Sequence, residues 1–309
     1  MDHVLTLATP AVSEVAAVAL PKATAALAAS GFQVGGAEWL APDRALDLPF
    51  HGASRGAAEA GEGVVRRALA DLPVDLAAQP REGRRKRLLV ADMESTVIAN
   101  EMLEELADHV GLRARVEEIT ARAMNGELDF RAALDERVAL LRGLPISVLE
   151  DSLSSVRVDP GAAALVATMG AHGATTALVS GGFEFYAERI RDRLGFGLCR
   201  ANRLGIRGGV LTGEVGEPIL DRDAKRVILL ELCGELSTDP SSAVTVGDGA
   251  NDLPMLKAAG LGVAYHGKPA VAAAARYRID HGDLSTLLFF QGYPAREWGT
   301  SPEASGPRG

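Results

Sequence analysis

Cysteine is almost absent from this chain. Its 309 residues include only Cys199 and Cys233, which excludes a disulfide framework and leaves no cysteine spacing of a zinc site. The six histidines are scattered and form no HxH or HxxxH pair. Neither covalent bridges nor a zinc centre is therefore expected to organise the fold.

The N-terminal region lacks both a leader and a membrane-spanning run. Met1-Asp2-His3 has no basic segment of the signal-peptide kind, and Pro10, Glu14, Pro21 and Lys22 interrupt the apolar stretch that follows. Positive charge is also in deficit, since the net charge is −9, whereas nucleic-acid binders usually carry a basic face. We expect a cytoplasmic protein that binds neither membranes nor nucleic acids.

Residues 1–80 predict a small separate unit, in keeping with a length that suggests roughly two domains. Strand, helix, strand, strand, helix and strand are expected, in that order, at residues 4–8, 12–29, 32–40, 45–50, 61–72 and 74–78. This β-α-β-β-α-β order is ferredoxin-like and resembles small regulatory modules of the ACT type. A structural role or a homodimer contact is an equally good interpretation, and no site residues stand out.

A basic linker is predicted at residues 81–87. Five of the nine residues at 79–87 are Arg or Lys, and in an acidic protein we interpret the segment as a solvated hinge rather than a nucleic-acid patch. Residues 88–298 then form the main domain. The tail at 299–309, which is rich in Pro, Ser and Gly, is expected to be disordered.

The main domain opens with a short apolar run that ends in two carboxylates. Residues 88–91 predict a strand buried on both faces of a parallel sheet, and Asp92 and Glu94 follow it. The two side chains point the same way because alternate residues of an extended segment share a face. The ligand crevice of such a sheet lies beyond the carboxyl ends of its strands. Taken alone, the stretch is explained equally well as a polar loop.

The rest of the domain predicts a doubly wound, Rossmann-like parallel sheet. A helical segment at about 100–155 follows the first strand and suggests a lid, and further strands are expected at 176–179, 243–246, 261–265 and 277–279. Residues 201–220, which contain a Gly-Gly pair, predict a β-hairpin. The loops after the strands should converge on one crevice.

Those loops combine an anion pocket with a carboxylate cluster. The hydroxyl of Ser180 lies beside the amides of Gly181 and Gly182, and Lys225 supplies a cation near a helix start. A further loop carries two more carboxylates, Asp248 and Asp252. The combination suits Mg²⁺, which prefers carboxylates together with substrate phosphate oxygens.

These motifs resemble the haloacid dehalogenase-like hydrolase superfamily. The matching stretches are Asp92-x-Glu94-x-Thr96, Ser180-Gly181-Gly182, Lys225 and Gly247-Asp248-Gly249-x-Asn251-Asp252. The predicted lid resembles the cap of phosphoserine phosphatases in Glu101, residues 123–127, Asp129-Phe130 and Arg137-Val138-x-Leu140-Leu141. The resemblance covers roughly residues 87–291 and leaves the N-terminal unit outside.

The resemblance implies Mg²⁺-dependent hydrolysis of O-phospho-L-serine to L-serine and phosphate, the last step of serine biosynthesis. Asp92 would be the nucleophile and would form an aspartyl-phosphate. Mg²⁺ would be held by the carboxylates of Asp92 and Asp248 and by the backbone carbonyl of Glu94. The Glu94 carboxyl would protonate the departing serine oxygen and later deprotonate the attacking water.

The remaining motif residues would bind the substrate. Ser180, Gly181, Lys225 and Asn251 are expected to hold the phosphate, with Asp252 orienting Lys225 or nearby waters. The amino-acid end requires one fixed charge of each sign, and these would come from residues of the cap and the glycine loop. Arg137 would bind the carboxylate with help from Gly182, Glu101 would bind the ammonium, and Met124 and Phe130 would wall the site.

Several alternatives stay open. Alone, Arg137 fits a surface salt bridge, Glu101 a helix-start carboxylate and Met124 a core residue. The family usually has Asp where this chain has Glu94, and the extra methylene puts proton transfer in question. The competing functions are a phosphatase or phosphotransferase that acts on another small phosphomonoester, such as phosphohomoserine, and a non-catalytic amino-acid sensor.

Overall fold

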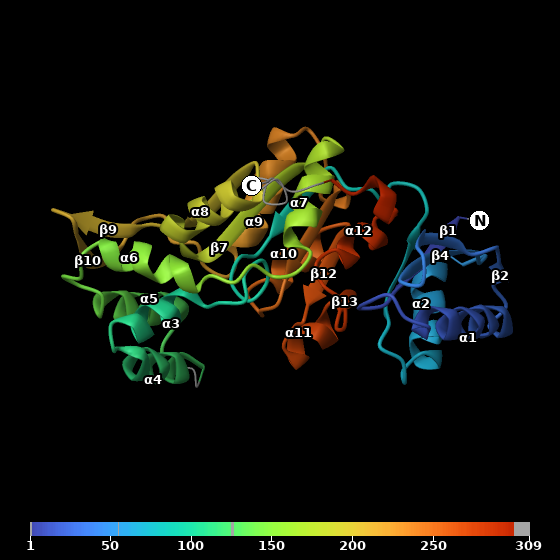
Figure 1. Cartoon of the computed structure of the whole chain (residues 1–309), viewed down its shortest axis with the longest axis horizontal. Coiled ribbons are helices and arrows are strands. Elements are labelled where there is room, and N and C mark those ends of the chain that lie inside the picture. Colours follow the sequence, from blue (N-terminus) through green and yellow to red (C-terminus); the bar gives the residue numbers. More distant parts are fainter. Residues whose placement is uncertain (1, 55, 125–126, 300–309) are drawn as a thin grey trace, which may run out of the picture.

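A parallel sheet of six strands forms the centre of the protein (Figure 1). The computed structural model describes residues 2–54, 56–124 and 127–299, except for the side chain of Met124. The strand order is β13-β12-β11-β6-β7-β8. These strands are β6 (Leu88–Ala91), β7 (Thr175–Phe183), β8 (Leu198–Asn202), β11 (Ala243–Gly247), β12 (Leu261–Tyr265) and β13 (Tyr277–Ile279). Because β6 pairs with both β11 and β7, the residue after it lies near the middle of the sheet's carboxyl edge.

Alternate residues of β6 face two different hydrophobic cores. Leu89 and Ala91 belong to the core built with α7 (Ala162–Ala171), α8 (Glu184–Leu194) and α12 (Thr286–Phe290). Leu88 and Val90 belong to the core built with α9 (Ala224–Glu235), α10 (Leu253–Ala258) and α11 (Pro269–Ala274). Helices on both faces explain why the strand is apolar throughout, and they confirm the predicted doubly wound sheet.

A helical cap is inserted between β6 and β7, as predicted. It consists of α3 (Met102–His109), α4 (Arg113–Met124), α5 (Phe130–Ala139), α6 (Ser147–Ser152) and the 3₁₀ turn η1 (Leu153–Ser155). The chain leaves and re-enters the core side by side, since Ile98 and Val158 form an antiparallel bridge. Both ends of the cap are therefore anchored at one place.

A β-hairpin extends the cap (left in Figure 1). Its strands are β9 (Leu204–Arg207) and β10 (Val210–Val215), joined by Gly208 and Gly209. Both glycines have positive φ, 59° and 79°, as a two-residue hairpin turn requires. Strand β10 packs on α5 at Gly213, where an added Cβ would lie 3.3 Å from the Cα of Ala139. The predicted hairpin is thus confirmed, and it forms one body with the lid helices.

The N-terminal unit is an antiparallel sheet with two helices on one face. Its strand order is β2-β4-β1-β5, with β3 also paired to β4, which is the ferredoxin-like order expected. Its elements are β1 (His3–Ala8), α1 (Val15–Ala29), β2 (Gln33–Val34), β3 (Glu38–Ala41), β4 (Ala45–His51), α2 (Ala57–Ala68) and β5 (Asp75–Pro80).

Two local expectations in this unit are wrong. The strand expected at 32–40 is divided into β2 and β3 around Gly35-Gly36. The helix expected to begin at Gly61 begins at Ala57, because Gly61 lies inside it against Phe50. A Cβ at Gly61 would be 2.8 Å from the Phe50 ring, so the glycine reflects close packing rather than a helix end.

The basic segment at 81–87 packs between the two units instead of forming a solvated hinge. Arg84 forms an ion pair with the buried Asp47 of β4. Lys86 is itself buried, and its ammonium donates to the carbonyls of Gly83 at 2.9 Å and Ser241 at 2.8 Å. The expectation of a solvated segment was wrong for Arg84 and Lys86, whose charges find acceptors in both units, whereas Arg81, Arg85 and Arg87 are exposed as expected.

The N-terminal unit is joined to the core through polar and apolar contacts. Asp75 of β5 accepts hydrogen bonds from the amides of Asp280 (2.7 Å), His281 (3.2 Å) and Gly282 (2.6 Å), in the loop after β13. Gln79 donates to the carbonyl of Phe290 at 2.8 Å, and the Tyr277 hydroxyl donates to that of Ala78 at 3.0 Å. The sheet face opposite α1 and α2 is thereby covered by the core.

Two short 3₁₀ turns lie in the C-terminal third of the chain. The turn η2 (Pro240–Ser242) directly precedes β11, and the turn η3 (Ala295–Glu297) lies near the end of the described residues. Gly299, the first residue of the expected tail, donates to the Thr168 hydroxyl at 2.9 Å, and the rest of that tail lies outside the described residues. Within the described ranges, no helix combines the length and apolarity needed to cross a bilayer.

Replacing Asp75 by Asn should weaken the junction between the two units. The amide group would turn donor atoms toward backbone N–H groups that now meet a carboxylate, and we expect a loss of about 3 kcal/mol in the free energy of unfolding. Urea denaturation followed by circular dichroism measures it. Asp71→Asn, at an exposed position four residues before β5, is the matched control and should change stability by less than about 0.5 kcal/mol. Equal stabilities of the two variants would contradict the assigned role of Asp75.

Candidate active site

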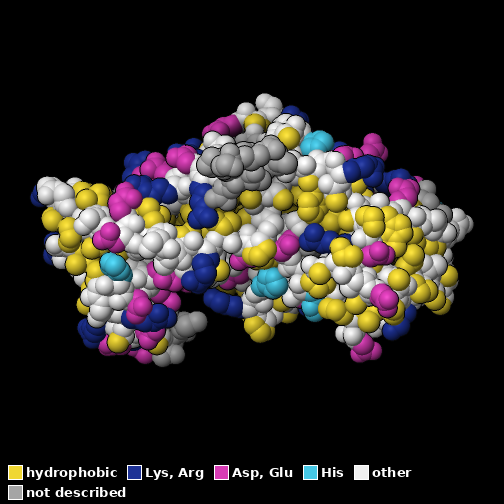
Figure 2. Space-filling model, in the orientation of Figure 1, with side chains coloured by type: hydrophobic (Ala, Val, Ile, Leu, Met, Phe, Trp, Pro, Cys, Tyr) yellow, Lys and Arg dark blue, Asp and Glu magenta, His cyan; other side chains and the backbone are white. Residues whose placement is uncertain are grey.

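A cavity of about 320 Å³ lies between the carboxyl edge of the large sheet and the cap. In the space-filling view the outline is notched between the cap, at left, and the core (Figure 2). The cavity is lined by side chains from both sides: Asp92, Glu94, Glu101, Leu103, Phe130, Leu134, Arg137, Gly181, Gly182, Phe183, Asp248, Gly249, Asn251 and Lys268. Most residues singled out in the sequence therefore meet in one place.

Four of the predicted site residues are not among the described residues that line the cavity. Lys225, Ser180 and Asp252 lie just behind the cavity wall, with exposed fractions of 2%, 1% and 0%. The side chain of Met124 lies outside the described residues. Its predicted position in the wall of the site stays a prediction.

Asp92 has one carboxylate oxygen engaged and one open. Its Oδ1 accepts from the amide of Met93 at 2.8 Å and from Lys225 Nζ at 2.7 Å. No hydrogen bond from the described part of the chain reaches Oδ2. The same ammonium donates to Asp252 Oδ1 at 2.6 Å, and Gly249 N donates to Asp252 Oδ2 at 2.9 Å. Lys225 is thus held between two buried carboxylates, one of which borders the cavity.

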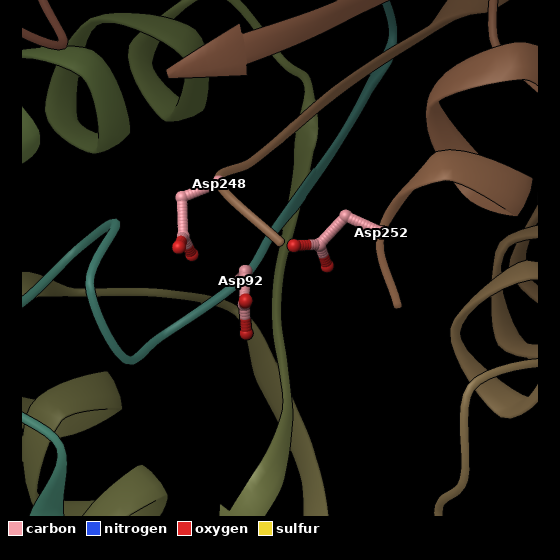
Figure 3. Close-up of side chains that lie close together, drawn as sticks. All are labelled: Asp92, Asp248 and Asp252. Atoms are coloured by element: carbon pink, nitrogen blue, oxygen red, sulfur yellow. The ribbon is translucent and has the colours of Figure 1, made fainter. Parts of the chain in front are cut away.

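Three carboxylates could hold a cation here. Oxygen atoms of Asp92, Asp248 and Asp252 lie within 4.8 Å of one another (Figure 3). Asp252 already has a donor on each oxygen, whereas Asp248 accepts only a long 3.4 Å bond from the Thr96 hydroxyl among the described residues. Asp92 and Asp248 therefore fit a divalent cation, and Asp252 fits the positioning of Lys225. An all-oxygen donor set of this kind suits Mg²⁺ rather than zinc.

The charges of the cluster are not balanced within the chain. Burial, followed by the nearby Asp252, raises the pKa of Asp92 well above its usual range, and the same two causes raise the pKa of Asp248 to about 6. Burial alone would lower the pKa of Lys225, but the adjacent Asp92 and Asp252 outweigh it and raise that pKa. Three carboxylates thus share one ammonium, and a bound divalent cation would stabilise the ionised forms of Asp92 and Asp248.

Glu94 reaches from the core to the first turn of the cap. Its Oε1 accepts from the amide of Met102, the first residue of α3, at 2.8 Å. A Cβ at Gly182 would lie 2.6 Å from Glu94 Oε2, so the longer side chain occupies space that only glycine leaves free. Burial, with a contribution from Glu101, raises the pKa of Glu94 to about 8. This carboxyl group is largely protonated at neutral pH.

The cap wall presents charges of both signs. Glu101 Oε1 accepts from the Ser95 hydroxyl at 2.7 Å, and Ser95 adopts the left-handed φ of 53° that aims its side chain there. Arg137 Nε donates to the carbonyl of Ala133 at 3.0 Å, which directs its guanidinium along α5 into the cavity. Burial lowers the pKa of Arg137, and nearby Glu94 and Glu101 partly offset this. A zwitterion would find a partner for each of its charges here.

The glycine loop differs in one detail from expectation. The Gly182 amide is engaged, since it donates to the Ser180 Oγ at 2.9 Å. Asn202 fixes the loop from behind by donating to the Gly181 carbonyl at 2.8 Å. The Ser180 hydroxyl, whose hydrogen has no side-chain or backbone acceptor among the described residues, is the donor left for an anion, and Gly181 lines the cavity beside it.

Sequence reasoning missed several residues of the site. Ser95 and Asn202 act through contacts that no local pattern reveals. Lys268 lies three residues beyond the end of β12, at the sheet edge where the other site loops lie. Applying the strand-end rule to that fourth strand, as to the other three, would have found it.

Comparison with known proteins identifies the class of this protein. Residues 89–257, more than half of the chain, match the family model described as haloacid dehalogenase-like hydrolase. The chain belongs to that hydrolase family.

Within the family, several of the similar proteins are phosphoserine phosphatases. The phosphoserine phosphatase of Polaromonas sp. is 45% identical over 208 residues, which cover 65% of this chain and 88% of that protein. A solved structure of a probable phosphoserine phosphatase from Vibrio cholerae, in unliganded form, is 28% identical with a TM-score of 0.77 and covers 96% of this chain and 88% of that one. A substrate-bound phosphoserine phosphatase structure is 36% identical with a TM-score of 0.61, over 66% of this chain and 97% of that one.

Replacing Asp248 by Asn should abolish Mg²⁺ binding. It removes the charge of one of the two carboxylates with open oxygens, so we expect an affinity loss beyond the roughly 10–100-fold that supporting residues of metal sites usually cost. Calorimetric titration of Mg²⁺ measures this directly, without turnover. Asp151→Asn, an exposed change of the same charge on α6, should bind Mg²⁺ like the original chain. Undiminished binding by Asp248→Asn would show that the cation site lies elsewhere.

Proposed function

We propose that the protein is a Mg²⁺-dependent phosphatase that hydrolyses O-phospho-L-serine to L-serine and phosphate, the last step of serine biosynthesis, in the cytoplasm. The observation that carries the proposal is a single cavity bordered by Asp92 at the core and by Arg137 and Glu101 at the cap. The first suits a phosphoryl group, and the other two suit a carboxylate and an ammonium. The curated relatives named as phosphoserine phosphatases support the same conclusion.

Asp92 is the proposed nucleophile. Its open oxygen attacks phosphorus in line with the leaving seryl oxygen, so that an O–P bond forms as the ester O–P bond breaks, giving an aspartyl-phosphate. Water then attacks phosphorus, releasing phosphate and restoring the carboxylate. The Lys225 ammonium, 2.7 Å from Asp92, opposes the rise that burial causes in the pKa of Asp92 and so favours its ionised form. When bound by Asp92, Asp248 and the Glu94 carbonyl, Mg²⁺ supplies positive charge that lets the two anions approach.

Glu94 is the proposed acid and base. With a pKa of about 8 it holds its proton at neutral pH, and it donates that proton to the departing seryl oxygen. The resulting carboxylate then takes a proton from the water that attacks the phospho-enzyme. The hydrogen bond from the Met102 amide and the close approach to Gly182 hold the Glu94 carboxyl group at the cavity, despite the extra methylene of its side chain.

The phosphate and the amino-acid group of the substrate are proposed to bind to opposite walls of the cavity. Ser180, Gly181, Lys225 and Asn251 are proposed to bind the non-bridging oxygens, with Asp252 orienting Lys225. On the cap side, Arg137 binds the substrate carboxylate, and Glu101 binds the ammonium while the Ser95 hydroxyl holds it in place. Phe130, Met124 and Gly182 complete the proposed enclosure, which excludes water from the reacting group.

The N-terminal unit is proposed to serve regulation or homodimer formation. Its sheet face opposite α1 and α2 is covered by the core, which limits a partner subunit to the helices or to the sheet edges. A serine or other amino-acid effector would likewise have to bind outside that covered face.

A panel of phosphate esters tests the function. We expect Mg²⁺-dependent phosphate release with the highest kcat/KM on O-phosphoserine, above phosphothreonine, phosphohomoserine and a sugar phosphate, and with Asp92→Asn as the blank. Arg137→Ala should lower kcat/KM on phosphoserine about 100-fold, because a charge-assisted fork to the carboxylate is lost, while hardly changing the sugar phosphate. Arg142→Ala, an exposed change near the end of α5, is the matched control.

The alternatives correspond to distinct outcomes of that panel. Highest activity on phosphohomoserine would assign a different phosphomonoester substrate. An indifferent profile, or one that Arg137→Ala leaves unchanged, would refute recognition of the amino-acid group. Release no greater than that of the Asp92→Asn blank on every ester would favour a non-catalytic amino-acid sensor.

The role of Glu94 has its own test. Glu94→Gln removes the proton donor and should lower kcat by at least about 100-fold, whereas Glu94→Asp keeps a carboxyl group and should retain most of the original rate. For the original chain kcat/KM should fall as the pH rises above about 8, because the acid form that the first step needs is then lost. Rate profiles from pH 6 to pH 10 measure this. If Glu94→Gln kept the full rate and the same profile, another group would be the acid.

A further inference from the structure

A second cation borders the cavity on the side opposite Arg137. Among the described lining residues the positively charged ones are Arg137 and Lys268. Arg137 lies on the cap, where its charge interacts with Glu94 and Glu101. Lys268 lies on the core beside Asp248 and Asn251, at the end of the cavity where the phosphate is proposed to bind.

The backbone of Lys268 is held against the loop that carries Asp248. Its amide donates to the Asp248 carbonyl at 3.3 Å, and its carbonyl accepts from Val271 at 2.8 Å as α11 begins. Two residues earlier, His266 donates its amide to the Ile279 carbonyl at 2.9 Å. The base of the side chain is therefore fixed relative to the carboxylate cluster.

The ammonium of Lys268, in contrast, is uncommitted. The residue is exposed, and no ion pair or hydrogen bond from any described residue reaches its Nζ. Lys268 nevertheless lines the same cavity as Asp248 and Asn251, which places its charge beside the cluster. A flexible stem with a compact charge can follow an anion as it moves, which a bonded guanidinium such as that of Arg137 does less readily.

The cavity carries an excess of negative charge, which the Lys268 ammonium would partly neutralise. Four carboxyl groups line it, Asp92, Glu94, Glu101 and Asp248, of which Glu94 holds its proton at neutral pH, and the phosphate of a substrate brings further negative charge. Lys225 is 2% exposed and already contacts two carboxylates, so it acts only once the phosphate has arrived. Besides a divalent cation at Asp92 and Asp248, a cation at the surface of the cavity would attract the phosphate during its approach.

We propose that Lys268 is a phosphate-binding residue that draws the phosphate group into the cavity and contacts inorganic phosphate as it leaves. The proposal rests on the proposed phosphatase function for its substrate, but the ligand it names is the phosphate dianion itself. The juxtaposition that carries it is an unpaired ammonium on a fixed loop beside Asp248, Asn251 and the cavity.

Substitution of Lys268 by Gln tests the proposal. We expect kcat/KM for phosphoserine to fall about tenfold at low salt with kcat little changed, and the difference to shrink as salt shortens the screening length to about 3 Å near 1 M. Lys268→Arg, which keeps the charge, should restore most of the loss. Lys257→Gln, an exposed change of the same charge on α10 that does not line the cavity, is the matched control and should behave like the original chain.

Binding of inorganic phosphate provides a readout that needs no turnover. In the presence of Mg²⁺, calorimetry should show phosphate binding weakened about tenfold by Lys268→Gln and unchanged by Lys257→Gln. Equal phosphate affinities of Lys268→Gln and the original chain would overturn the proposal, as would a change in Mg²⁺ affinity alone, which would mark Lys268 as a partner of Asp248. If the original chain hydrolysed none of the esters, the proposed function would fail, and the phosphate titration would still decide the role of Lys268.

Discussion

The contact of Lys225 with two buried carboxylates is the constraint on which the site depends. Asp92 follows the central strand, Lys225 comes from α9 and Asp252 from the loop before α10, so the three charges tie together segments far apart in the sequence. Burying such charges is expensive unless each has partners, and removal of any one leaves the others uncompensated. The arrangement leaves a surplus of negative charge toward the cavity. That surplus is what makes a divalent cation at Asp92 and Asp248 favourable.

The same short loop also connects the core to the cap. Glu94 accepts from the first amide of α3, and Ser95 donates to Glu101 immediately before that helix. The proposed acid and the proposed ammonium-binding residue are therefore positioned by neighbouring hydrogen bonds. A cap movement that displaced α3 would move both groups together. The proposed proton transfer and the proposed substrate recognition would thus be coupled through α3, and the missing Cβ of Gly182 leaves the space that the longer Glu94 side chain requires.

The N-terminal unit is built into the enzyme rather than tethered beside it. Asp75 binds three successive amides after β13, and the buried pair of Arg84 with Asp47 anchors the linker. The segment bound by Asp75 includes Gly282, whose carbonyl lies 3.0 Å from a ring nitrogen of His266, in the loop that leads to Lys268. The unit thus contacts a segment that borders the active-site loops, although its own elements line no part of the cavity described.

The sequence by itself determined five of the six strands of the large sheet, the motif residues and their convergence, because an apolar run ending in carboxylates is a local pattern and parallel strands share one carboxyl edge. The edge strand β8 (Leu198–Asn202) was not predicted. The sequence also determined the ferredoxin-like element order and the hairpin at Gly208-Gly209. Only the tertiary structure decided which carboxylate oxygens stay open, why Gly61 lies inside a helix, and that the basic linker is packed. The same holds for Ser95, Asn202 and Lys268. Each of these depends on partners distant in the chain, and periodicity carries no information about which distant atoms will meet.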